Sequence, residues 1–354
     1  MKISDLDTPA VVVDLDILEA NLARAQAHAD ALGLRLRPHV KTHKLPRVAK
    51  MQMALGAVGI TCQKLGEAEA MADAGLADIF LPYNILGPAK RARLAALARR
   101  VTLSVSADSA ETVVGYAETF ADTARPLPVL IECDTGAGRC GVKGPAEAVA
   151  LAARIAAAPG LRFAGLMTYP PQGRPAEVDR WLADTVAALA AAGLPAPLVS
   201  TGGTPDLYRL TSRGVATEYR PGTYAYGDRM QVGWGHGALE HCALSVRATV
   251  VSRPTPDRAI LDAGSKALAA DAVAAGGFGH IPGWAEARIV GLSEEHATVD
   301  LSACGPDRPR VGDRLAVIPN HACVVSNLHD VIHLARRGAE VVAIDPVTSR
   351  GRLG

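Results

Sequence analysis

Short β-branched runs alternate with amphipathic helical stretches from residue 8 to about 220, and this alternation constrains the fold most strongly. Strand, helix and strand in succession make a βαβ unit, in which the two strands are parallel. The nine apolar runs are Ala10–Val13, Leu36–Val40, Val58–Cys62, Ile79–Tyr83, Val101–Val105, Val129–Cys133, Phe163–Thr168, Leu198–Thr201 and Thr217–Arg220. About eight repeats of the unit predict a (β/α)8 TIM barrel, and a doubly wound open sheet is the alternative.

A barrel needs eight strands, so one of the nine runs must pair elsewhere. The first run, Ala10–Val13, is the odd one out, and Leu36–Val40 then becomes the first barrel strand. Lys41 follows at the C-terminal end of that strand, where the active sites of such barrels lie. A lysine in this position suits a Schiff base with an aldehyde cofactor, and a lysine in a basic loop is the alternative.

The pattern changes after about residue 237, where short β-rich runs are separated by Gly, Pro and Asp turns. Without a long helical period, this part predicts a second, mostly antiparallel domain. We expect a barrel domain over residues 1–237 and a β domain over residues 238–354, with residues 1–14 as candidates to join the second domain. Its predicted strands are Leu244–Ser252, Arg258–Asp262, Ala287–Val290, Thr298–Ser302, Arg314–Ile318 and Glu340–Ile344.

The composition argues against several classes of partner. The chain has 37 basic and 36 acidic residues, so it carries no electrostatic footprint for nucleic acid or an anionic membrane. No apolar stretch is long and uncharged enough to span a bilayer, and the start lacks an apolar signal core. The six cysteines form no CxxC pair, which is typical of reduced cysteines and favours a cytoplasmic location.

Three glycine-containing segments follow predicted strands. Thr201-Gly202-Gly203-Thr204 lets the backbone approach an anion and opens a helix, whose N-terminus presents N–H groups to a phosphate. Arg220-Pro221-Gly222-Thr223-Tyr224 offers a second glycine turn after the last strand. Phosphate binding by the last two βα loops is a recurrent use of this barrel. The segment 134–141 places Arg139 on a loop at the barrel mouth, and a surface arginine is the alternative.

His321 and Cys323 lie in the predicted β domain. In an extended segment, side chains two positions apart point to the same side, so both could reach one ion. Imidazole plus thiolate suits zinc, and two protein ligands leave positions open for a substrate. A structural histidine beside a buried cysteine gives the same pattern, and without further support that interpretation is favoured.

These segments together resemble the fold-type III pyridoxal phosphate (PLP) enzymes. The resemblance is to the alanine racemase superfamily and, within it, to the D-threonine aldolase and D-serine dehydratase branch. It covers nearly the whole chain. The segments that carry it are Asp7–Ala10, Arg37–Lys44, Thr61–Lys64, Gly136–Gly141, Gly202–Thr204, Gly222–Tyr226, Leu261–Gly264, His321–Cys323 and Asn327–Asp330.

The resemblance implies a role for each matching residue. Lys41 matches the Schiff-base lysine, and Arg139 matches the arginine that contacts the phenolic oxygen of the cofactor. Tyr169 takes the place of the ring that lies against the pyridine, and Arg220 that of the arginine at the pyridine nitrogen. His321 and Cys323 match a pair that holds a divalent metal (Zn, Mn or Mg). The residues expected around the phosphate and the lysine are His39, Thr201, Gly202, Gly203, Thr204, Gly222, Thr223 and Tyr224.

Departures from the family patterns reduce the number of reactions that the resemblance allows. Racemases carry a catalytic tyrosine in the second domain, but the matching segment 261–266 has none, so racemisation is not favoured. Non-catalytic PLP carriers lack a second domain. The branch implies a D-amino acid substrate and a homodimer. The expected reaction is cleavage of a D-3-hydroxy-α-amino acid to glycine and an aldehyde. The alternative is a D-serine or D-threo-3-hydroxyaspartate type dehydratase. The dehydratases share His-x-Cys, whereas the aldolases typically show His-x-Asp. The aldolases also often have a histidine after the tyrosine, where this chain has Pro170 and Pro171 after Tyr169.

Overall fold

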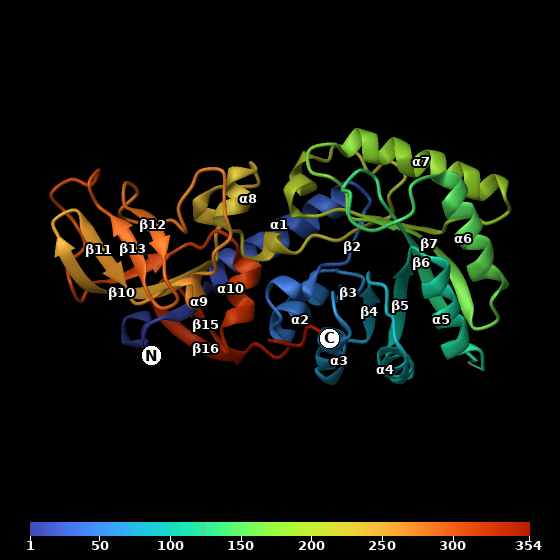
Figure 1. Cartoon of the computed structure of the whole chain (residues 1–354), viewed down its shortest axis with the longest axis horizontal. Coiled ribbons are helices and arrows are strands. Elements are labelled where there is room, and N and C mark those ends of the chain that lie inside the picture. The colour runs from blue at the N-terminus through green and yellow to red at the C-terminus, as the bar shows by residue number, and fades with distance from the viewer. Residues whose placement is uncertain (123) are drawn as a thin grey trace. The chain divides into compact units, whose positions relative to one another are not determined.

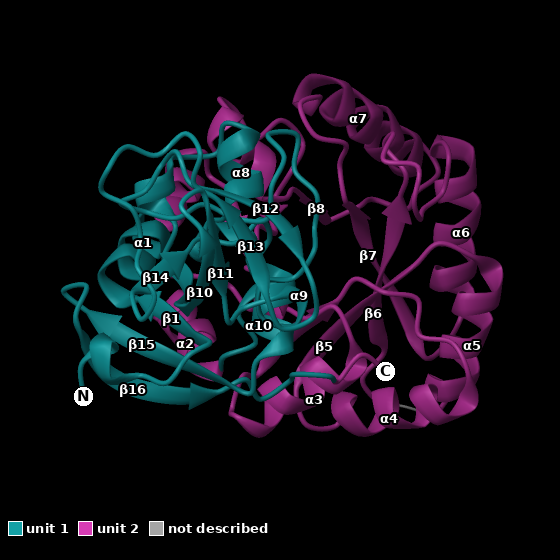
Figure 2. Cartoon of the chain, turned by 60° about the vertical axis from the view of Figure 1, so that its left-hand side comes forward, with its two compact units in different colours: residues 1–24, 42–45, 223–351 teal, residues 25–41, 46–222, 352–354 magenta. Residues whose placement is uncertain are grey.

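The computed structural model describes residues 1–122 and 124–354. They form two compact units, which Figure 2 colours separately: unit 1 comprises residues 1–24, 42–45 and 223–351, and unit 2 comprises residues 25–41, 46–222 and 352–354. The long C-terminal segment of unit 1 begins at residue 223. The boundary expected near residue 237 stays a prediction, because the grouping of contacts alone does not define a domain that folds by itself.

Unit 2 contains an eight-stranded, all-parallel sheet in the order β2-β9-β8-β7-β6-β5-β4-β3. Its strands are β2 (Arg35–Leu36), β3 (Ile60–Thr61), β4 (Asp78–Leu81), β5 (Thr102–Ala107), β6 (Leu127–Cys133), β7 (Leu161–Thr168), β8 (Leu198–Thr201) and β9 (Glu218–Tyr219). Helices cover the outside of the curled sheet (Figure 1). They are α2 (Pro46–Ala54), α3 (Leu65–Asp73), α4 (Pro88–Ala98), α5 (Ala110–Phe120), α6 (Pro145–Ala157) and α7 (Pro175–Ala191). Helix α1 (Leu15–Ala31) spans the two units.

Hydrogen bonds join the two edge strands of this sheet. The N–H of Val58 donates to the carbonyl of Leu36 at 2.9 Å, and that of Thr61 donates to Pro38 at 2.8 Å. On the other side, the N–H of His39 donates to Pro221 at 2.9 Å. Strand β2 is short because Pro38 has no N–H for the ladder, although the backbone stays extended through His39. The predicted TIM barrel is confirmed.

Successive side chains along the barrel strands belong to two separate layers of apolar residues. Ile79 and Leu81 belong to the large cluster that the sheet shares with its helices. Phe80 lies between them in sequence and packs instead with Leu130 and Met167. Because successive side chains of a strand point to opposite faces, this smaller cluster fills the barrel interior.

Unit 1 contains a second sheet that is mostly antiparallel, as predicted, in the order β12-β13-β11-β10-β1-β15-β16 with β14 paired to β10. The strands are β1 (Ala10–Asp14), β10 (Leu244–Thr255), β11 (Arg258–Leu261), β12 (Arg288–Leu292), β13 (Ala297–Asp300), β14 (Arg314–Val317), β15 (Val331–Arg336) and β16 (Glu340–Pro346). The helices are α8 (Arg229–Gly233), α9 (Ser265–Leu268) and α10 (Ala322–Leu328). The run at 10–13 is thus a central strand of this sheet, which explains why it is apolar on both faces.

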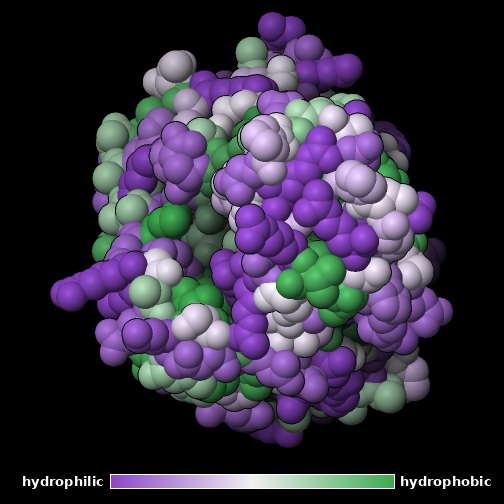
Figure 3. Space-filling view, turned by 90° about the vertical axis from the view of Figure 1, so that its left-hand side faces the viewer, coloured by the Kyte–Doolittle hydropathy of each residue, from purple (hydrophilic) through white to green (hydrophobic). Residues whose placement is uncertain are grey.

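The surface is mainly polar on the face that Figure 3 shows, where hydrophobic side chains form several separate groups rather than one continuous patch. Isolated apolar side chains of this kind are normal on a folded protein. Among the described residues, no helix combines the length and the apolar character that crossing a bilayer requires.

Candidate functional site

Lys41 lies just beyond the extended backbone of β2, in a short 3-10 helix, η2 (Val40–Thr42). The preceding His39 is buried, bridges to the backbone of Thr61, and places its Nε2 3.0 Å from the side-chain oxygen of Gln63. Lys41 itself is half-buried, and no hydrogen bond or ion pair of its amine is found in the described part of the chain. The structure therefore places a primary amine at the C-terminal end of a barrel strand, where the sequence predicted it.

The two predicted phosphate loops of the barrel meet. Thr204 begins the 3-10 helix η3 (Thr204–Arg209), and its hydroxyl accepts the N–H of Gly222 at 3.3 Å. Gly202 has φ +99°, and a Cβ there would lie 2.3 Å from the ring of Tyr219. That ring donates its hydroxyl to the carbonyl of Gly203 at 2.9 Å. Only glycine fits at position 202, and the result is a wall of backbone rather than side chains beside Thr201.

Thr223 and Tyr224 start the 3-10 helix η4 (Thr223–Ala225) and belong to unit 1. Both are buried. The hydroxyl oxygen of Thr223 lies 3.5 Å from the sulfur of Cys323. The structure therefore brings Thr223 to the predicted metal pair, and its expected role at the phosphate stays a prediction.

Arg139, Tyr169 and a carboxylate that the sequence analysis missed form one cluster. The guanidinium carbon of Arg139 lies 4.6 Å from the ring centre of Tyr169, within cation–π range. Its NH2 lies 3.7 Å from Oε1 of Glu132, a buried residue of β6. Burial raises the pKa of Glu132, and the charge of Arg139 opposes that rise. The available signal was a charged residue within the otherwise apolar run 129–133.

The loop that carries Arg139 is held by Asp134. Its Oδ1 accepts the N–H groups of Gly136 and Gly138, both at 3.0 Å, and its Oδ2 pairs with Lys143 at 2.5 Å. The hydrogen bond with Lys143 and those with the two glycines lower the pKa of Asp134 to about 2. The loop is thus fixed locally by one ionised carboxylate.

Arg220 is buried and hydrogen-bonded within the barrel. Its guanidinium donates to the hydroxyl of Ser200 and, at 2.7 Å, to the carbonyl of Thr168. The Ser200 hydroxyl in turn donates to Glu218, which pairs with Arg37 at 2.7 Å. Burial lowers the pKa of Arg220 to about 10, against the charges of the buried carboxylates. The neighbouring hydrogen bonds therefore fix the guanidinium in one orientation, and sequence spacing alone had not linked these residues.

His321 and Cys323 are brought together, but by a different local structure from the one expected. The prediction of an extended segment is wrong: His321 is the N-cap of α10, and Cys323 lies in its first turn. Backbone N–H groups at a helix start need acceptors, and the buried Asp228 accepts the N–H of Ala322 at 3.0 Å. Its Oδ2 also lies 2.9 Å from Nδ1 of His321.

The neighbours of this pair favour positive charge at the imidazole and place a hydroxyl beside the sulfur. Burial lowers the pKa of His321, but hydrogen bonds with Asp228 and Cys323 outweigh burial and raise it to about 11. The hydroxyl of the fully buried Thr42 lies 3.2 Å from the sulfur. Within residues 1–122 and 124–354, no third His, Cys, Asp or Glu joins the pair as a metal ligand. The arrangement offers two ligands and open positions.

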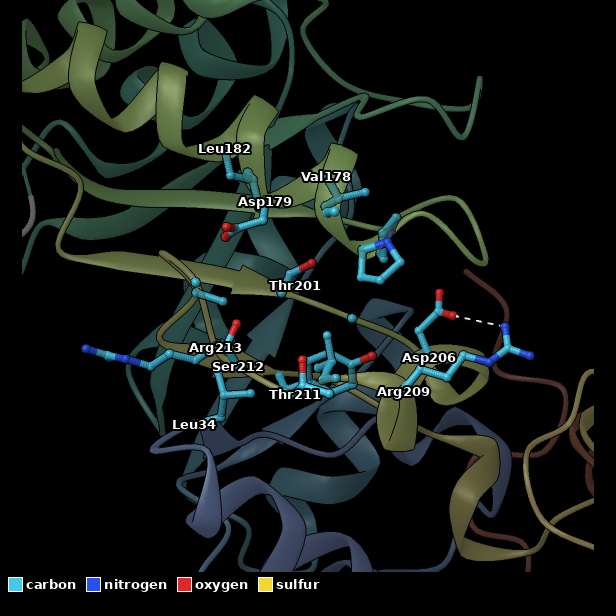
Figure 4. Close-up of a pocket in the computed structure, with 18 of the residues that line it drawn as sticks. Leu34, Val178, Asp179, Leu182, Thr201, Asp206, Arg209, Thr211, Ser212 and Arg213 are labelled. Carbon is cyan, nitrogen blue, oxygen red and sulfur yellow. Dashed lines mark hydrogen bonds and ion pairs between the residues drawn. The ribbon is translucent and has the colours of Figure 1, made fainter.

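A separate cavity of about 280 Å³ lies in unit 2 beside α7 (Figure 4). Val178, Asp179 and Leu182 of α7 face the segment 209–214 across it, and Thr201 and Gly202 line one wall. The element after β8 is only the six-residue η3, which leaves this space in the helical layer. Lys41 and Arg139 do not line the cavity, whereas Thr201 and Gly202 of the first glycine loop do.

Comparison with known proteins places these features in one family. The family described as alanine racemase, N-terminal domain, matches residues 13–230, and the putative serine dehydratase domain matches residues 243–335. The D-threonine aldolase of Arthrobacter sp is 37% identical over 359 residues, which cover 98% of this chain and 93% of that protein. The D-threo-3-hydroxyaspartate dehydratase of Delftia sp. (strain HT23) is 35% identical over 354 residues, covering 90% and 91%.

A solved structure agrees with these matches. The crystal structure of D-threonine aldolase from Filomicrobium marinum matches this fold with a TM-score of 0.93 at 34% sequence identity, covering 100% of this chain and 98% of that one. The chain belongs to the fold-type III pyridoxal phosphate enzymes of the alanine racemase superfamily, in the branch of the D-threonine aldolases and the D-3-hydroxyaspartate dehydratases.

Proposed function

We propose that this protein is a PLP-dependent lyase that cleaves D-3-hydroxy-α-amino acids to glycine and an aldehyde, with the help of a divalent metal (Zn, Mn or Mg). The observation that carries the proposal is the match to D-threonine aldolase along 98% of the chain. Lys41, the glycine loops and the His321–Cys323 pair all lie within the matched length. The homodimer and the cytoplasmic location stay predictions.

The residues of the barrel fit the cofactor. Lys41 offers an amine without an acidic partner among the described residues, and Gly202 leaves the backbone of its loop uncovered where a Cβ would collide with Tyr219. Lys41 would hold the aldehyde group, and the loops around Gly203 and Gly222 would bind the phosphate. Arg139 would meet the phenolic oxygen, with Tyr169 against the ring. Bound PLP would supply an electron sink for the bonds at the substrate Cα.

The predicted metal pair fits a divalent ion by the chemistry of its donors. The imidazole of His321 has a carboxylate partner on Nδ1, and the sulfur of Cys323 has hydroxyl neighbours. These two side chains would hold the ion, which would act as a Lewis acid on the 3-hydroxyl of the substrate. A base that removes the hydroxyl proton then permits cleavage between Cα and Cβ.

Dehydration is the second candidate function, because one curated dehydratase is 35% identical to this chain and because the pair is His-x-Cys. In that reaction Lys41 would take the proton from Cα, and the 3-hydroxyl would leave. The substrate class is the same, but the products are a 2-oxo acid and ammonia. The difference lies in which proton a base removes first.

Product analysis tests both candidates. The purified protein is incubated with PLP and D-threonine, D-serine or D-threo-3-hydroxyaspartate, with and without a chelator. Glycine and an aldehyde are expected, whereas a 2-oxo acid and ammonia would establish the dehydratase. The PLP-loaded protein should show an absorbance peak of the imine near the edge of the visible range. This peak should disappear in Lys41→Ala and persist in Lys50→Ala, where Lys50 is an exposed residue of α2. Absence of the chromophore in the wild type would overturn the whole proposal.

A further inference from the structure

We propose that Asp228 is a positioning residue of the predicted metal pair, which holds His321 in the tautomer that leaves Nε2 free to bind the ion. This inference rests on the proposed function and extends it. Neither the family resemblance nor the comparisons assign a role to Asp228. It is a positioning residue because it acts on the ion only through His321.

Two backbone hydrogen bonds bring Asp228 to the histidine. The N–H of Arg229 donates to Pro319 at 3.1 Å, and the N–H of Met230 donates to Asn320 at 3.0 Å. Asn320 is itself fixed, because its amide nitrogen donates to the carbonyls of Asp271 and Gly277, each at 2.8 Å. Backbone hydrogen bonds therefore tie the start of α8 to the segment between β14 and α10.

The carboxylate of Asp228 is fully buried and acts as an acceptor on both oxygens. Oδ1 accepts the N–H of Gln231 at 2.8 Å, which makes Asp228 the N-cap of α8. Oδ2 accepts the N–H of Ala322 and also lies 2.9 Å from Nδ1 of His321. A carboxylate oxygen accepts hydrogen bonds, so the ring nitrogen 2.9 Å from Oδ2 is the donor and Nδ1 carries a proton. The remaining ring nitrogen is then the one that can ligate.

The second ligand has neighbours of its own. The hydroxyls of Thr42 and Thr223 lie 3.2 and 3.5 Å from the sulfur of Cys323. Hydroxyl donors stabilise a sulfur that carries negative charge, which is the form that binds metals. Both ligands thus have polar neighbours within hydrogen-bonding distance. Such outer partners orient the ligands and raise metal affinity.

Asp228→Asn is the informative variant. Asparagine keeps the shape and can still cap Gln231 through its amide oxygen. It removes the negative charge and replaces Oδ2, which accepts the N–H of Ala322 and faces Nδ1 of His321, with an NH2 group that can only donate. Metal affinity is measured by calorimetry with Zn²⁺, and the ligand field by the absorbance of the Co²⁺-loaded protein. We expect Asp228→Asn to bind Zn²⁺ about 10–100-fold more weakly and to alter the Co²⁺ spectrum.

Asp14→Asn is the matched control. Asp14 accepts the N–H groups of Asp16 and Ile17 at the start of α1 through Oδ1, so it caps its own helix as Asp228 caps α8, without a histidine partner. Unchanged Zn²⁺ affinity is expected for this control. His321→Ala and Cys323→Ala each remove one predicted ligand and show the Zn²⁺ affinity that remains without the metal pair. PLP absorbance, recorded for every variant, reports whether the cofactor site remains intact.

The outcomes separate this inference from the proposed function. If Asp228→Asn binds Zn²⁺ as the wild type does while His321→Ala does not, the positioning role is wrong and the lyase proposal stands. If the wild type binds no Zn²⁺, both this inference and the metal part of the proposal fail, and the reaction products still decide the lyase. Should the variant not fold, ¹⁵N NMR of histidine-labelled, Zn²⁺-loaded wild type decides: a zinc-induced shift at Nε2 supports the inference, and one at Nδ1 overturns it.

Discussion

The hydroxyl oxygen of Thr42 lies 3.2 Å from the sulfur of Cys323, although 281 positions separate the two residues. Thr42 also directly follows Lys41 in the chain. One small polar residue therefore contacts the predicted metal pair and is bonded to the predicted cofactor lysine. Its complete burial leaves little room for a substitute of another size.

Thr42→Val replaces this hydroxyl with a methyl group of nearly the same volume. Loss of one hydrogen bond to the sulfur costs about 1 kcal/mol, so Zn²⁺ affinity should fall by roughly 5-fold in calorimetry. Thr42→Ser keeps the hydroxyl and should bind Zn²⁺ as the wild type does. Equal affinities for the valine and serine variants would show that the hydroxyl does not support the sulfur.

Gly202→Ala should abolish tight PLP binding, because its Cβ would lie 2.3 Å from the Tyr219 ring and because φ is +99°. Gly193→Ala separates the two causes. Gly193 has φ +72°, but a Cβ at this position would have no atom within 4 Å, so it reports backbone strain alone, about 1 kcal/mol. PLP titration by absorbance and thermal unfolding are measured for both variants. Similar losses of PLP affinity and of thermal stability in the two variants would mean that the contact with Tyr219 is unimportant.

The sequence predicted the parts of this protein that follow from periodicity and from strand ends. Alternation of strands and helices placed Lys41 and the glycine loops beside the same end of one parallel sheet, because parallel strands share their C-terminal edge. The pairing of His321 with Cys323 was expected, but for the wrong reason. An N-cap histidine followed by a first-turn cysteine and an extended pair look alike in sequence when the helix has only seven residues.

Other residues were missed because long-range contacts leave no local pattern. Asp228 lies 93 positions from His321, and in sequence it is an ordinary N-cap before a short helix. Strand β15 was missed as well, since it follows His329-Asp330 directly without a glycine or proline turn. Glu132 did leave a signal, because a charge within a buried strand requires a partner.

The Asp134 carboxylate gives a stability contribution that depends on pH. Its pKa falls from 3.8 to about 2 on folding, chiefly through Lys143 and the glycine N–H groups. The native state therefore binds fewer protons than the unfolded chain, and the contribution is present above pH 3.8 and lost as the pH falls toward 2. Asp134→Asn should lower the free energy of unfolding by about 1–2 kcal/mol at neutral pH, since the exposed Lys143 is partly screened by solvent.

Denaturant unfolding of wild type and Asp134→Asn at several pH values measures this difference. It should shrink toward zero as the pH approaches 2. Lys143→Met removes the main partner without changing the carboxylate, and it should reproduce part of the loss at neutral pH. A difference that stays constant between neutral and acid pH would contradict the assignment to the Asp134 charge.

Glu132→Gln should have opposite effects on stability and on cofactor binding. Burial raises the pKa of Glu132 above 4.5, against the influence of Arg139, so the native state binds a proton more tightly than the unfolded chain does. A raised carboxyl pKa means that the stability of the wild type, relative to the glutamine variant, falls as the pH rises through and above 4.5. The glutamine variant should therefore gain stability relative to the wild type between acid and neutral pH.

The same variant loses the charge 3.7 Å from the guanidinium of Arg139, and so the group expected at the phenolic oxygen is held less firmly. PLP affinity at neutral pH should fall by about 5–10-fold, because charge-assisted contacts contribute roughly 1–1.5 kcal/mol. Denaturant unfolding without the cofactor and PLP titration by absorbance are run on the same preparations. Weaker PLP binding together with equal or greater stability would assign Glu132 to the site rather than to the fold, whereas a parallel loss of both would assign it to the fold.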